Sequence, residues 1–359
     1  MTSNPVFSIT IPIGSYHPFL ESCLASLGAQ DVAVDIAVLD ASNDNRVVEL
    51  IDQFADIIAF RQHGPDNGQS DAIMRGWAAT RGFILGWLNA DDVLAPGALR
   101  YAYEAFLDDP SRDVVYGHSL IRDDDSFVTG YHWNVMPPGD QILSTCSISQ
   151  PSCFFKRSAL EAVGGLNRDL HYTMDWDLWI RLYQNGAKFY LEDDIRSLVL
   201  WSKQAKTGGF GRARRSELKR IIEAHTDVGD RRRAILGFAT QYVYEYLLPR
   251  SLRDWIWRRN VSGGNAMFGL NVSGDIEKCA VFDLFHYDRL PKTSINLRTR
   301  LNSHSFRIGV DGAEASLHTS QNGLLVYKMP KQLPAGECAR IEVQSATDSP
   351  IHISGIQLR

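Results

Sequence analysis

Short β-branched runs alternate with helical patterns over the first 110 residues, and this alternation constrains the fold more than any other feature. Val6–Ile11 predicts a buried strand that Pro12 ends, and apolar residues then recur at helical spacing from Phe19 to Leu27. Strand, helix and strand at these lengths predict an α/β sheet with parallel neighbours. Further strands are expected near 34–39, 56–60, 83–88, 113–119, 126–131, 150–156, 188–191 and 198–201, and further helices near 69–79, 96–109, 158–163 and 175–184.

Acidic side chains follow two of the predicted strands. Asp40 ends the second strand, and Asp91 and Asp92 come shortly after the strand at 83–88. Because ligands of such sheets bind at the carboxyl ends of the strands, we expect these carboxylates at one rim. Adjacent carboxylates repel each other, and Mg²⁺ or Mn²⁺ relieves the repulsion while water and substrate phosphates complete its shell. A solvated loop before the helix at Pro96 explains the same pair.

The charge distribution argues for a local anionic ligand. The chain holds 37 Lys and Arg against 42 Asp and Glu, a net charge of -5, so it lacks the basic excess of a nucleic-acid binder. Residues 201–220 nonetheless carry seven basic side chains and one acid, which suits phosphate or lipid headgroups, or simply a solvated face. The segment SKQAKTGGFGRARR, residues 202–215, predicts a flexible basic loop that could act as a lid.

Cysteine usage and hydropathy favour a cytoplasmic protein. The five cysteines are odd in number, widely spaced and without a CxxC pair, so neither a disulfide framework nor a zinc site is expected. The start MTSNPVFSITIPIG does not match a signal peptide, and nowhere do 18 apolar residues run together. We therefore expect neither secretion by a standard signal nor a membrane-spanning helix.

Two further regions follow the α/β part. Apolar residues at helical spacing from Ile235 to Leu247 predict an amphipathic helix that Pro249 ends. Trp255 and Trp257 stand among arginines, which is typical of a helix touching an anionic membrane, although packing between domains explains them as well. From about 275, short alternating stretches between turn residues predict a small all-β sandwich. The expected regions are 1–207 for the α/β domain, 208–262 for a basic loop and helical linker, and 275–359 for the sandwich.

Four ordered segments carry a resemblance to a known family. They are FSITIPIGSYHPFLESCLASLGAQ, DIAVLDASNDN, GPDNGQSDAIMRGWAATRGFILGWLNADD and QPSCFFKRSALEAVGGLNRDLHYTMDWDLWIRL. In this order, over about residues 5–207, they resemble the family 2 glycosyltransferases of the GT-A fold, of the bacterial surface-polysaccharide type. The resemblance implies a Rossmann-like nucleotide-sugar-binding domain that performs an inverting, metal-dependent transfer from a nucleotide diphosphate sugar.

The resemblance also implies roles for individual acidic residues. Asp40 corresponds to the carboxylate that hydrogen-bonds the nucleotide base. Asp71 and Arg75, four residues apart on one helix face, correspond to further nucleotide contacts, although a helix cap or surface charge explains each of them alone. Asp91 corresponds to the ribose or metal-shell aspartate, and Asp92 to the metal ligand that bridges the diphosphate.

The sequence departs from the family pattern near the metal. Asn89 stands where the common DxDD form begins with Asp, which suggests that this position is not essential to metal binding. Ser202 lies near the place where many relatives carry a His ligand. Metal ligation would then rest on Asp92, diphosphate and water, while Lys203 and Lys206 help to neutralise the leaving group.

Asp175 falls where the family keeps its catalytic base, at the start of a helix. A sugar hydroxyl is a poor nucleophile until its proton is removed, so a base is needed. Met174 stands where relatives often have Glu, and a helix cap is the alternative role for Asp175, with Asp177 the stronger candidate for a cap or structural partner. Gln150 and Trp176 are expected to flank the acceptor, where an aromatic face suits a sugar ring; a core position explains Trp176 equally.

These inferences predict transfer from a UDP-sugar by default to a glycan or lipid-linked acceptor at the cytoplasmic membrane face, with Mn²⁺ or Mg²⁺ as cofactor. Two alternatives stay open. A noncatalytic carbohydrate-binding protein on a degenerate transferase domain would bind glycan without nucleotide or metal, and Asn89, Met174 and Ser202 motivate it. A sugar nucleotidyltransferase would release pyrophosphate, but its glycine-rich signature is missing near the first strand. The sequence also lacks the motifs of four other enzyme classes, which are GxGxxG after the first strand, GxxxxGK[ST], GxSxG and HExxH. It therefore gives no support for a dinucleotide oxidoreductase, a P-loop NTPase, a serine hydrolase or a zinc protease.

Overall fold

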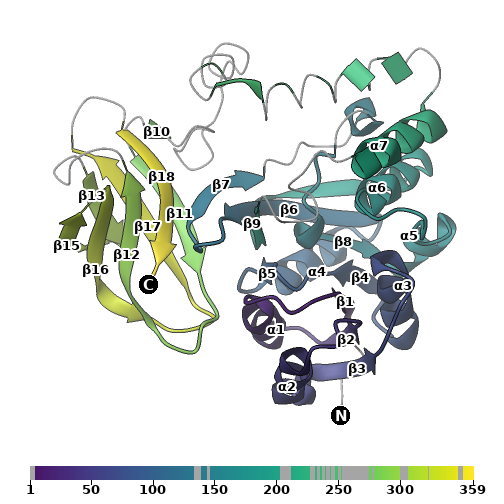
Figure 1. Cartoon of the computed structure of the whole chain (residues 1–359), viewed down its shortest axis with the longest axis horizontal. Helices are drawn as coiled ribbons and strands as arrows, with labels where there is room; N and C mark the ends of the chain where they lie inside the picture. Colours follow the sequence, from purple (N-terminus) through teal and green to yellow (C-terminus); the bar gives the residue numbers. More distant parts are fainter. Residues whose placement is uncertain are drawn as a thin grey trace. The chain divides into compact units, whose positions relative to one another are not determined.

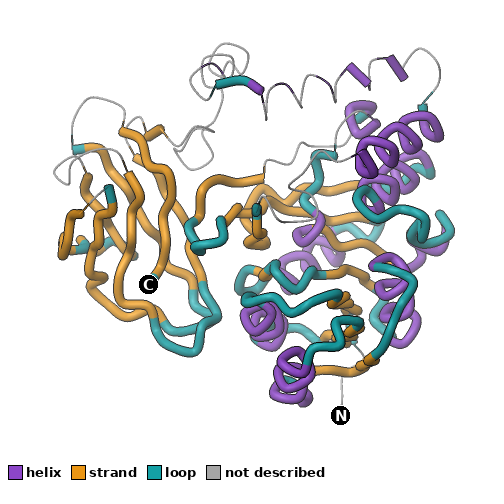
Figure 2. Tube along the Cα trace, in the orientation of Figure 1, coloured by secondary structure: helices purple, strands orange, loops and turns teal. Residues whose placement is uncertain are grey.

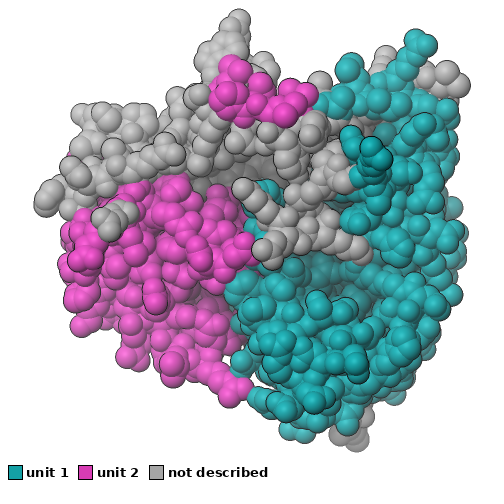
Figure 3. All heavy atoms as spheres, viewed as in Figure 1, with its two compact units in different colours: residues 1–119, 132–239 teal, residues 120–131, 240–359 magenta. Residues whose placement is uncertain are grey.

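The computed structural model divides the chain into two compact units, coloured in Figure 3. Unit 1 is Met1–Ser119 with His132–Ala239, and unit 2 is Leu120–Tyr131 with Thr240–Arg359. Residues 120–131 group with the C-terminal residues because Val128 pairs with Ile356 across two strands, whereas the sequence predicted one domain over 1–207. The structure describes residues 5–132, 139–143, 146–202, 212–226, 231–232, 235–236, 239, 243, 247–249, 252, 275–276, 279–299, 306–321, 323–346 and 351–359.

Unit 1 is built on a mostly parallel sheet with the strand order β6-β8-β4-β1-β2-β3. Strands β1 to β4 are parallel neighbours, whereas β8 runs antiparallel to β4 and β6. Helix α3 contacts β1 and β2, and Figures 1 and 2 show it across these strands from α1 and α2. The elements are β1 (Phe7–Ile13), α1 (Leu20–Gly28), β2 (Val34–Asp40), α2 (Asn45–Gln53), β3 (Ile58–His63), α3 (Gln69–Ala79), β4 (Ile84–Trp87), β5 (Val93–Leu94), α4 (Ala98–Asp108), β6 (Val114–Arg122), β8 (Cys153–Lys156), α5 (Arg157–Ala162), α6 (Met174–Gln184), β9 (Phe189–Leu200) and α7 (Arg212–His225), with 3₁₀ turns η1 (Ala55–Ile57), η2 (Asp140–Leu143) and η3 (Gln150–Ser152).

The sequence predicted that Pro12 ends the first strand. In the structure Pro12 lies inside β1 instead. The pairing of β1 with β4 ends with Thr10 opposite Trp87, and the carbonyl of Thr10 accepts a hydrogen bond from Leu88 on that side. Pro12 lies two residues further on and faces the same side, where the ladder has ended. Its missing N–H therefore costs no ladder hydrogen bond, and the strand continues to Ile13.

The two short strands predicted at 188–191 and 198–201 form a single strand, β9. The charged residues between the two predicted strands have partners: Asp193 lies 2.9 Å from His118 of β6, and Arg196 pairs within β9. Arg196 lies 2.8 Å from Glu192 and 2.9 Å from Asp194. Because these charge-assisted hydrogen bonds satisfy the guanidinium, the strand can pass through the charged stretch without a turn.

The last four residues of the predicted basic loop, 212–215, are helical. Arg212 opens α7, which buries Leu218, Ile221 and Ile222 in the same apolar cluster as Trp179 of α6. The apolar spacing of these three residues fixes the helix, and the arginines before them form its first turn. The strand predicted at about 56–60 is likewise displaced, because η1 precedes β3.

Two antiparallel sheets with buried inner positions make up unit 2, as predicted for the all-β region (Figure 1). One has the order β15-β16-β12-β18-β7, with β10 paired to β18, and the other β11-β17-β13-β14. Ile295, Leu325 and Ile341 are buried in them. Strand β15 was not predicted, because most of its residues are exposed and polar. The elements are β7 (Val128–His132), β10 (Asp275–Ile276), β11 (Cys279–Phe285), β12 (Lys292–Thr299), β13 (Phe306–Val310), β14 (Ala313–Glu314), β15 (Ser316–Gln321), β16 (Leu324–Leu333), β17 (Cys338–Ser345) and β18 (Ile351–Leu358).

Several predicted features fall beyond the described residues. The amphipathic helix at 235–247 is described at only a few positions, and Trp255 and Trp257 lie outside the described part altogether. No described helix is both long and apolar enough to cross a membrane. All five cysteines are free thiols.

Candidate active site

Asp40 lies at the carboxyl end of β2, as predicted, and its side chain is buried. Its Oδ1 accepts a hydrogen bond from the N–H of Ser42 at 2.9 Å, and its Oδ2 lies 2.9 Å from Nδ1 of His63. The two residues face each other because Asp40 pairs with His63 in the register of β2 and β3. His63 was not among the predicted site residues, although its place at the end of a neighbouring parallel strand was a usable signal.

Helix α3 brings Asp71 and Arg75 together, as their spacing predicted. A guanidinium nitrogen of Arg75 lies 2.6 Å from the buried carboxylate of Asp71, and Arg168 approaches the same carboxylate at 3.6 Å. Both arginines remain partly or largely exposed. Asp71 thus holds two cations near the start of α3, a suitable arrangement for an anionic ligand. Arg168 comes from the loop before α6, which carries no sequence pattern, so it was not singled out.

Asn89 is the centre of a hydrogen-bonded group at the carboxyl end of β4. Its Nδ2 donates to Asp92 Oδ2 at 3.0 Å and to Gln150 Oε1 at 3.3 Å. Its Oδ1 accepts from Gln69 Nε2 at 2.7 Å, and Gln150 donates in turn to the carbonyl of Trp87 at 2.6 Å. An amide can both donate and accept, whereas a carboxylate only accepts. This dual role explains in physical terms why Asn stands at this position.

The Asp91 and Asp92 pair fits a divalent metal that arrives with phosphate. Asp92 is buried and accepts a hydrogen bond from the N–H of Leu200 at 3.3 Å, while Asp91 is partly exposed. Within the described part of the chain, no three His, Cys, Asp or Glu side chains converge as metal ligands. Mg²⁺ and Mn²⁺ accept such a small set of protein carboxylates when water and phosphate oxygens supply the remaining ligands.

Strand β9 brings the start of the basic segment to this pair. Val93 and Leu94, directly after Asp92, pair with the end of β9, and Leu200 closes the strand. Ser202, two residues further on, is buried. Lys203 and Lys206 lie beyond the described residues, so their proposed contact with the leaving group stays a prediction.

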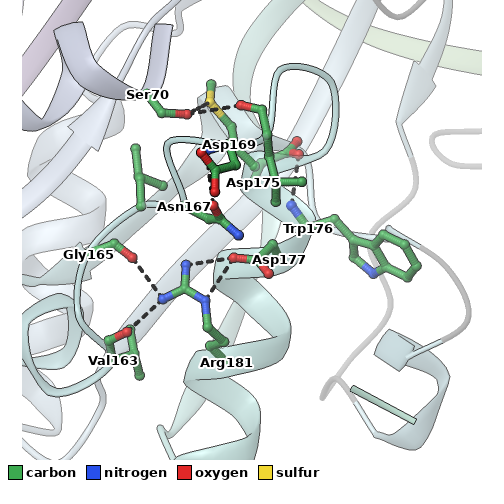
Figure 4. Close-up of polar contacts among 12 residues, drawn as sticks. Ser70, Val163, Gly165, Asn167, Asp169, Asp175, Trp176, Asp177 and Arg181 are labelled. Atoms are coloured by element: carbon green, nitrogen blue, oxygen red, sulfur yellow. Dashed lines mark hydrogen bonds and ion pairs between the residues drawn. The ribbon is translucent and has the colours of Figure 1, made fainter. Parts of the chain in front are cut away.

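Asp175 lies in the first turn of α6 and is partly exposed. Its Oδ1 accepts a hydrogen bond from the N–H of Trp176 at 2.8 Å (Figure 4). Burial raises the pKa of the Cys146 and Cys153 thiols, and the charge of Asp175 raises it further. The carboxylate therefore faces thiols that stay protonated and uncharged.

The structure contradicts an acceptor-stacking role for Trp176. The residue is 1% exposed, and its Nε1 donates to the carbonyl of Ile142 at 2.6 Å. A ring enclosed in the core has no face left for a sugar, so the core alternative accounts for Trp176.

Asp177 is a structural partner, which was its expected role. It lies 2.8 Å from Arg181 within α6 and 3.1 Å from Nε2 of His225 in α7. Burial alone would raise the pKa of Asp177, but the hydrogen bond with His225 and the charge of Arg181 outweigh burial and lower it.

Comparisons with known proteins agree with this geometry. Residues 8–164 match glycosyl transferase family 2. Over 189 residues the chain is 28% identical to a PGL/p-HBAD biosynthesis glycosyltransferase of Mycobacterium tuberculosis, covering 51% of this chain and 72% of the relative. It is 26% identical over 202 residues to a chondroitin synthase of Pasteurella multocida, covering 55% of this chain and 21% of the synthase. The fold is similar to that of S. aureus TarS 1–349 in complex with UDP-GlcNAc, with a TM-score of 0.52, 14% identity, and coverage of 71% and 76% of the two chains.

The sheet and the structural similarity define a domain of the GT-A fold. Over residues 8–164 the chain is similar to glycosyl transferase family 2, the family that the four sequence segments resemble. The family and the fold predicted from the four sequence segments are thereby confirmed.

Proposed function

We propose that the protein is an inverting, metal-dependent glycosyltransferase that moves a sugar from a nucleotide diphosphate sugar to a glycan or lipid-linked acceptor. One observation carries the proposal: the first turn of α3 is linked to Asp92 through Asn89, and it also contacts Met174, the residue before the proposed base. Gln69 bonds to Asn89, which bonds to Asp92, and the next residue, Ser70, lies 2.9 Å from Met174 Sδ (Figure 4). Asp175 follows Met174 directly.

The donor side uses the rim of the sheet. Asp40 would accept a hydrogen bond from an N–H of the base, and a UDP-sugar is the default donor because Asp40 and Asp71 resemble the uracil-side contacts of many relatives. Asp91 and Asp92 would hold the metal, which when bound neutralises charge on the diphosphate. Arg75, positioned by Asp71, adds a cation near the start of α3. These roles are carried over from the family resemblance, and the burial of the carboxylates supports them.

The acceptor side uses Asp175. The acceptor hydroxyl transfers its proton to the Asp175 carboxylate while its oxygen forms a bond to the anomeric carbon. The bond from that carbon to the diphosphate oxygen breaks on the opposite face, so the nucleoside diphosphate leaves with the electron pair. A single displacement of this kind inverts the anomeric configuration. Gln150 would orient the acceptor or donor sugar from its place beside Asn89.

We place this reaction in the synthesis of a bacterial surface polysaccharide, on the cytoplasmic face of the membrane. The relative named for chondroitin synthesis supports polysaccharide assembly, and the TarS complex shows UDP-GlcNAc held by a protein of similar fold. Peripheral membrane contact would come from the arginine- and tryptophan-rich residues after Pro249.

The donor site is tested by thermal unfolding of the chain with UDP, GDP, dTDP, CMP and ADP, each with Mn²⁺ or EDTA. A ligand at a hundredfold excess over its Kd stabilises the native state by about 2.7 kcal/mol. We expect a metal-dependent shift with one nucleotide that disappears in Asp92→Ala. If no nucleotide shifts the transition while glycans still bind, the donor assignment is wrong and the glycan-binding alternative is supported.

The base is tested with the donor identified in that experiment. Asp175→Asn preserves the side-chain shape and can still accept the Trp176 N–H, so nucleotide binding should persist. The transfer rate should fall by roughly 10²- to 10⁴-fold, the usual contribution of a general base. Asp108→Asn, an exposed residue of α4, serves as the matched control and should leave the rate unchanged. A wild-type rate in Asp175→Asn contradicts the assignment.

A further inference from the structure

Glu217 of α7 is a buried carboxylate that the proposed reaction does not use. Its side chain accepts hydrogen bonds from the N–H of His171 at 2.9 Å, the N–H of Tyr172 at 2.8 Å and the hydroxyl of Thr173 at 3.1 Å. The residue is 4% exposed, and no described Lys, Arg or His lies within ion-pair distance of it. A buried carboxylate without a cation is costly, so its three donors must compensate it.

All three donors belong to the residues that lead into α6. The helix begins at Met174, and Thr173, its N-cap residue, makes no side-chain capping bond of its own. Glu217 does not cap the helix itself, because its donors come before Met174; it holds in place the residues that lead into the helix. A negative charge at a helix N-terminus is also favoured by the helix dipole. One side chain of α7 thus fixes three consecutive residues that end two positions before Asp175.

The start of α6 is also held from the side of α3. Ser70 Oγ lies 3.3 Å from the carbonyl of Leu170 and 2.9 Å from Met174 Sδ (Figure 4). Further along, His225 at the end of α7 contacts Asp177 of α6. The chain from 170 to 174 therefore has fixed partners on two helices, and Asp175 follows it immediately.

We propose that Glu217 is a positioning residue for the base of the proposed transfer reaction. By holding residues 171–173 it orients the first turn of α6, and with it the Asp175 carboxylate, toward the acceptor hydroxyl. Proton abstraction requires hydrogen-bond distance, and a misplacement of about 1 Å can cost roughly 10²-fold in rate. The inference rests on the proposed function, because Asp175 must be the base for its position to matter.

The test is Glu217→Gln, compared with Glu223→Gln as the matched control. Gln has nearly the same shape but one acceptor oxygen, so its NH₂ group must face one of the three donors. Glu223 lies on the same helix, is exposed and pairs only at 3.7 Å with Lys219. We expect kcat to fall by roughly 10- to 100-fold in Glu217→Gln with the donor KM unchanged. Amide hydrogen exchange should accelerate over 168–178, and Glu223→Gln should behave as wild type in both measurements.

A second variant covers the case in which Glu217→Gln does not fold. Thr173→Val removes only the hydroxyl donor and keeps both backbone bonds to Glu217, so we expect a smaller fall in kcat, again at constant donor KM. An unchanged kcat in the folded variants, or a loss that appears equally in the donor KM, overturns the positioning role while leaving the transferase proposal intact. A wild-type chain that transfers no sugar from any donor overturns the proposed function itself, and the inference with it.

Discussion

Asp177→Asn should lower the stability of unit 1 through a charge pair that links α6 to α7. The Asp177 side chain is 6% exposed, and its two oxygens serve different partners, Arg181 Nε at 2.8 Å and His225 Nε2 at 3.1 Å. Asparagine keeps the shape but removes the charge. It also keeps one acceptor oxygen, so one of the two contacts must be lost and the other weakened.

The size of the effect follows from the burial of the partners. Removing one member of a buried ion pair typically costs about 3 to 5 kcal/mol. Arg181 retains hydrogen bonds to the carbonyls of Val163 and Gly165 at 2.8 and 2.7 Å, and the introduced asparagine would still accept one bond. We therefore expect a loss at or just below the lower end of this range, about 2 to 3 kcal/mol in the free energy of unfolding. Urea unfolding followed by tryptophan fluorescence measures it.

The loss should depend on pH with a defined sign. The pKa of Asp177 is lowered in the folded protein, so its contribution is full above the unfolded value of about 3.9 and is lost as the pH falls through the folded pKa. The difference between wild type and variant should therefore shrink as the pH falls below about 4. Equal stability at pH 6, or a difference that persists undiminished at pH 3, would refute the reasoning.

Two further substitutions test the packing and the rim. Gly82→Ala would place a Cβ against the backbone carbonyl of Phe7, which cannot move aside, so the free energy of unfolding in urea should fall by about 3 kcal/mol. Gly130→Ala is the control, because open space surrounds Gly130, and it should lower the free energy of unfolding much less. Asn89→Asp would set a second carboxylate 3.0 Å from Asp92 in place of an amide donor. Because the two carboxylates repel each other, the melting temperature of this variant should fall in EDTA and recover with Mn²⁺. A fall that Mn²⁺ does not reverse would contradict the metal assignment.

The site residues whose positions could be predicted from the sequence are those that follow from the spacing of nearby residues along the chain. Asp40 and Asp92 follow buried strands, so their place at one edge of the sheet could be inferred from the strand–helix alternation alone. Asp71 and Arg75 pair because four residues bring side chains to the same helix face. The helix at 69–79 was predicted with its observed bounds for the same reason.

The parts that sequence missed depend on contacts between distant segments. Arg168 reaches Asp71 from a loop far along the chain, and Glu217 reaches the start of α6 from another helix. Trp176 could not be assigned to core or acceptor side from spacing, because its partner Ile142 comes from a distant turn. None of these pairings leaves a periodic signal in the sequence.

The amide of Asn89 has a consequence for the order in which ligands bind. It stands where a third carboxylate would add negative charge beside Asp92, so the proposed metal site would attract a bare dication less strongly than a DxDD cluster would. The diphosphate then supplies the missing charge. We expect donor and metal to enter together as one complex, and metal occupancy to rise and fall with donor concentration rather than with free metal.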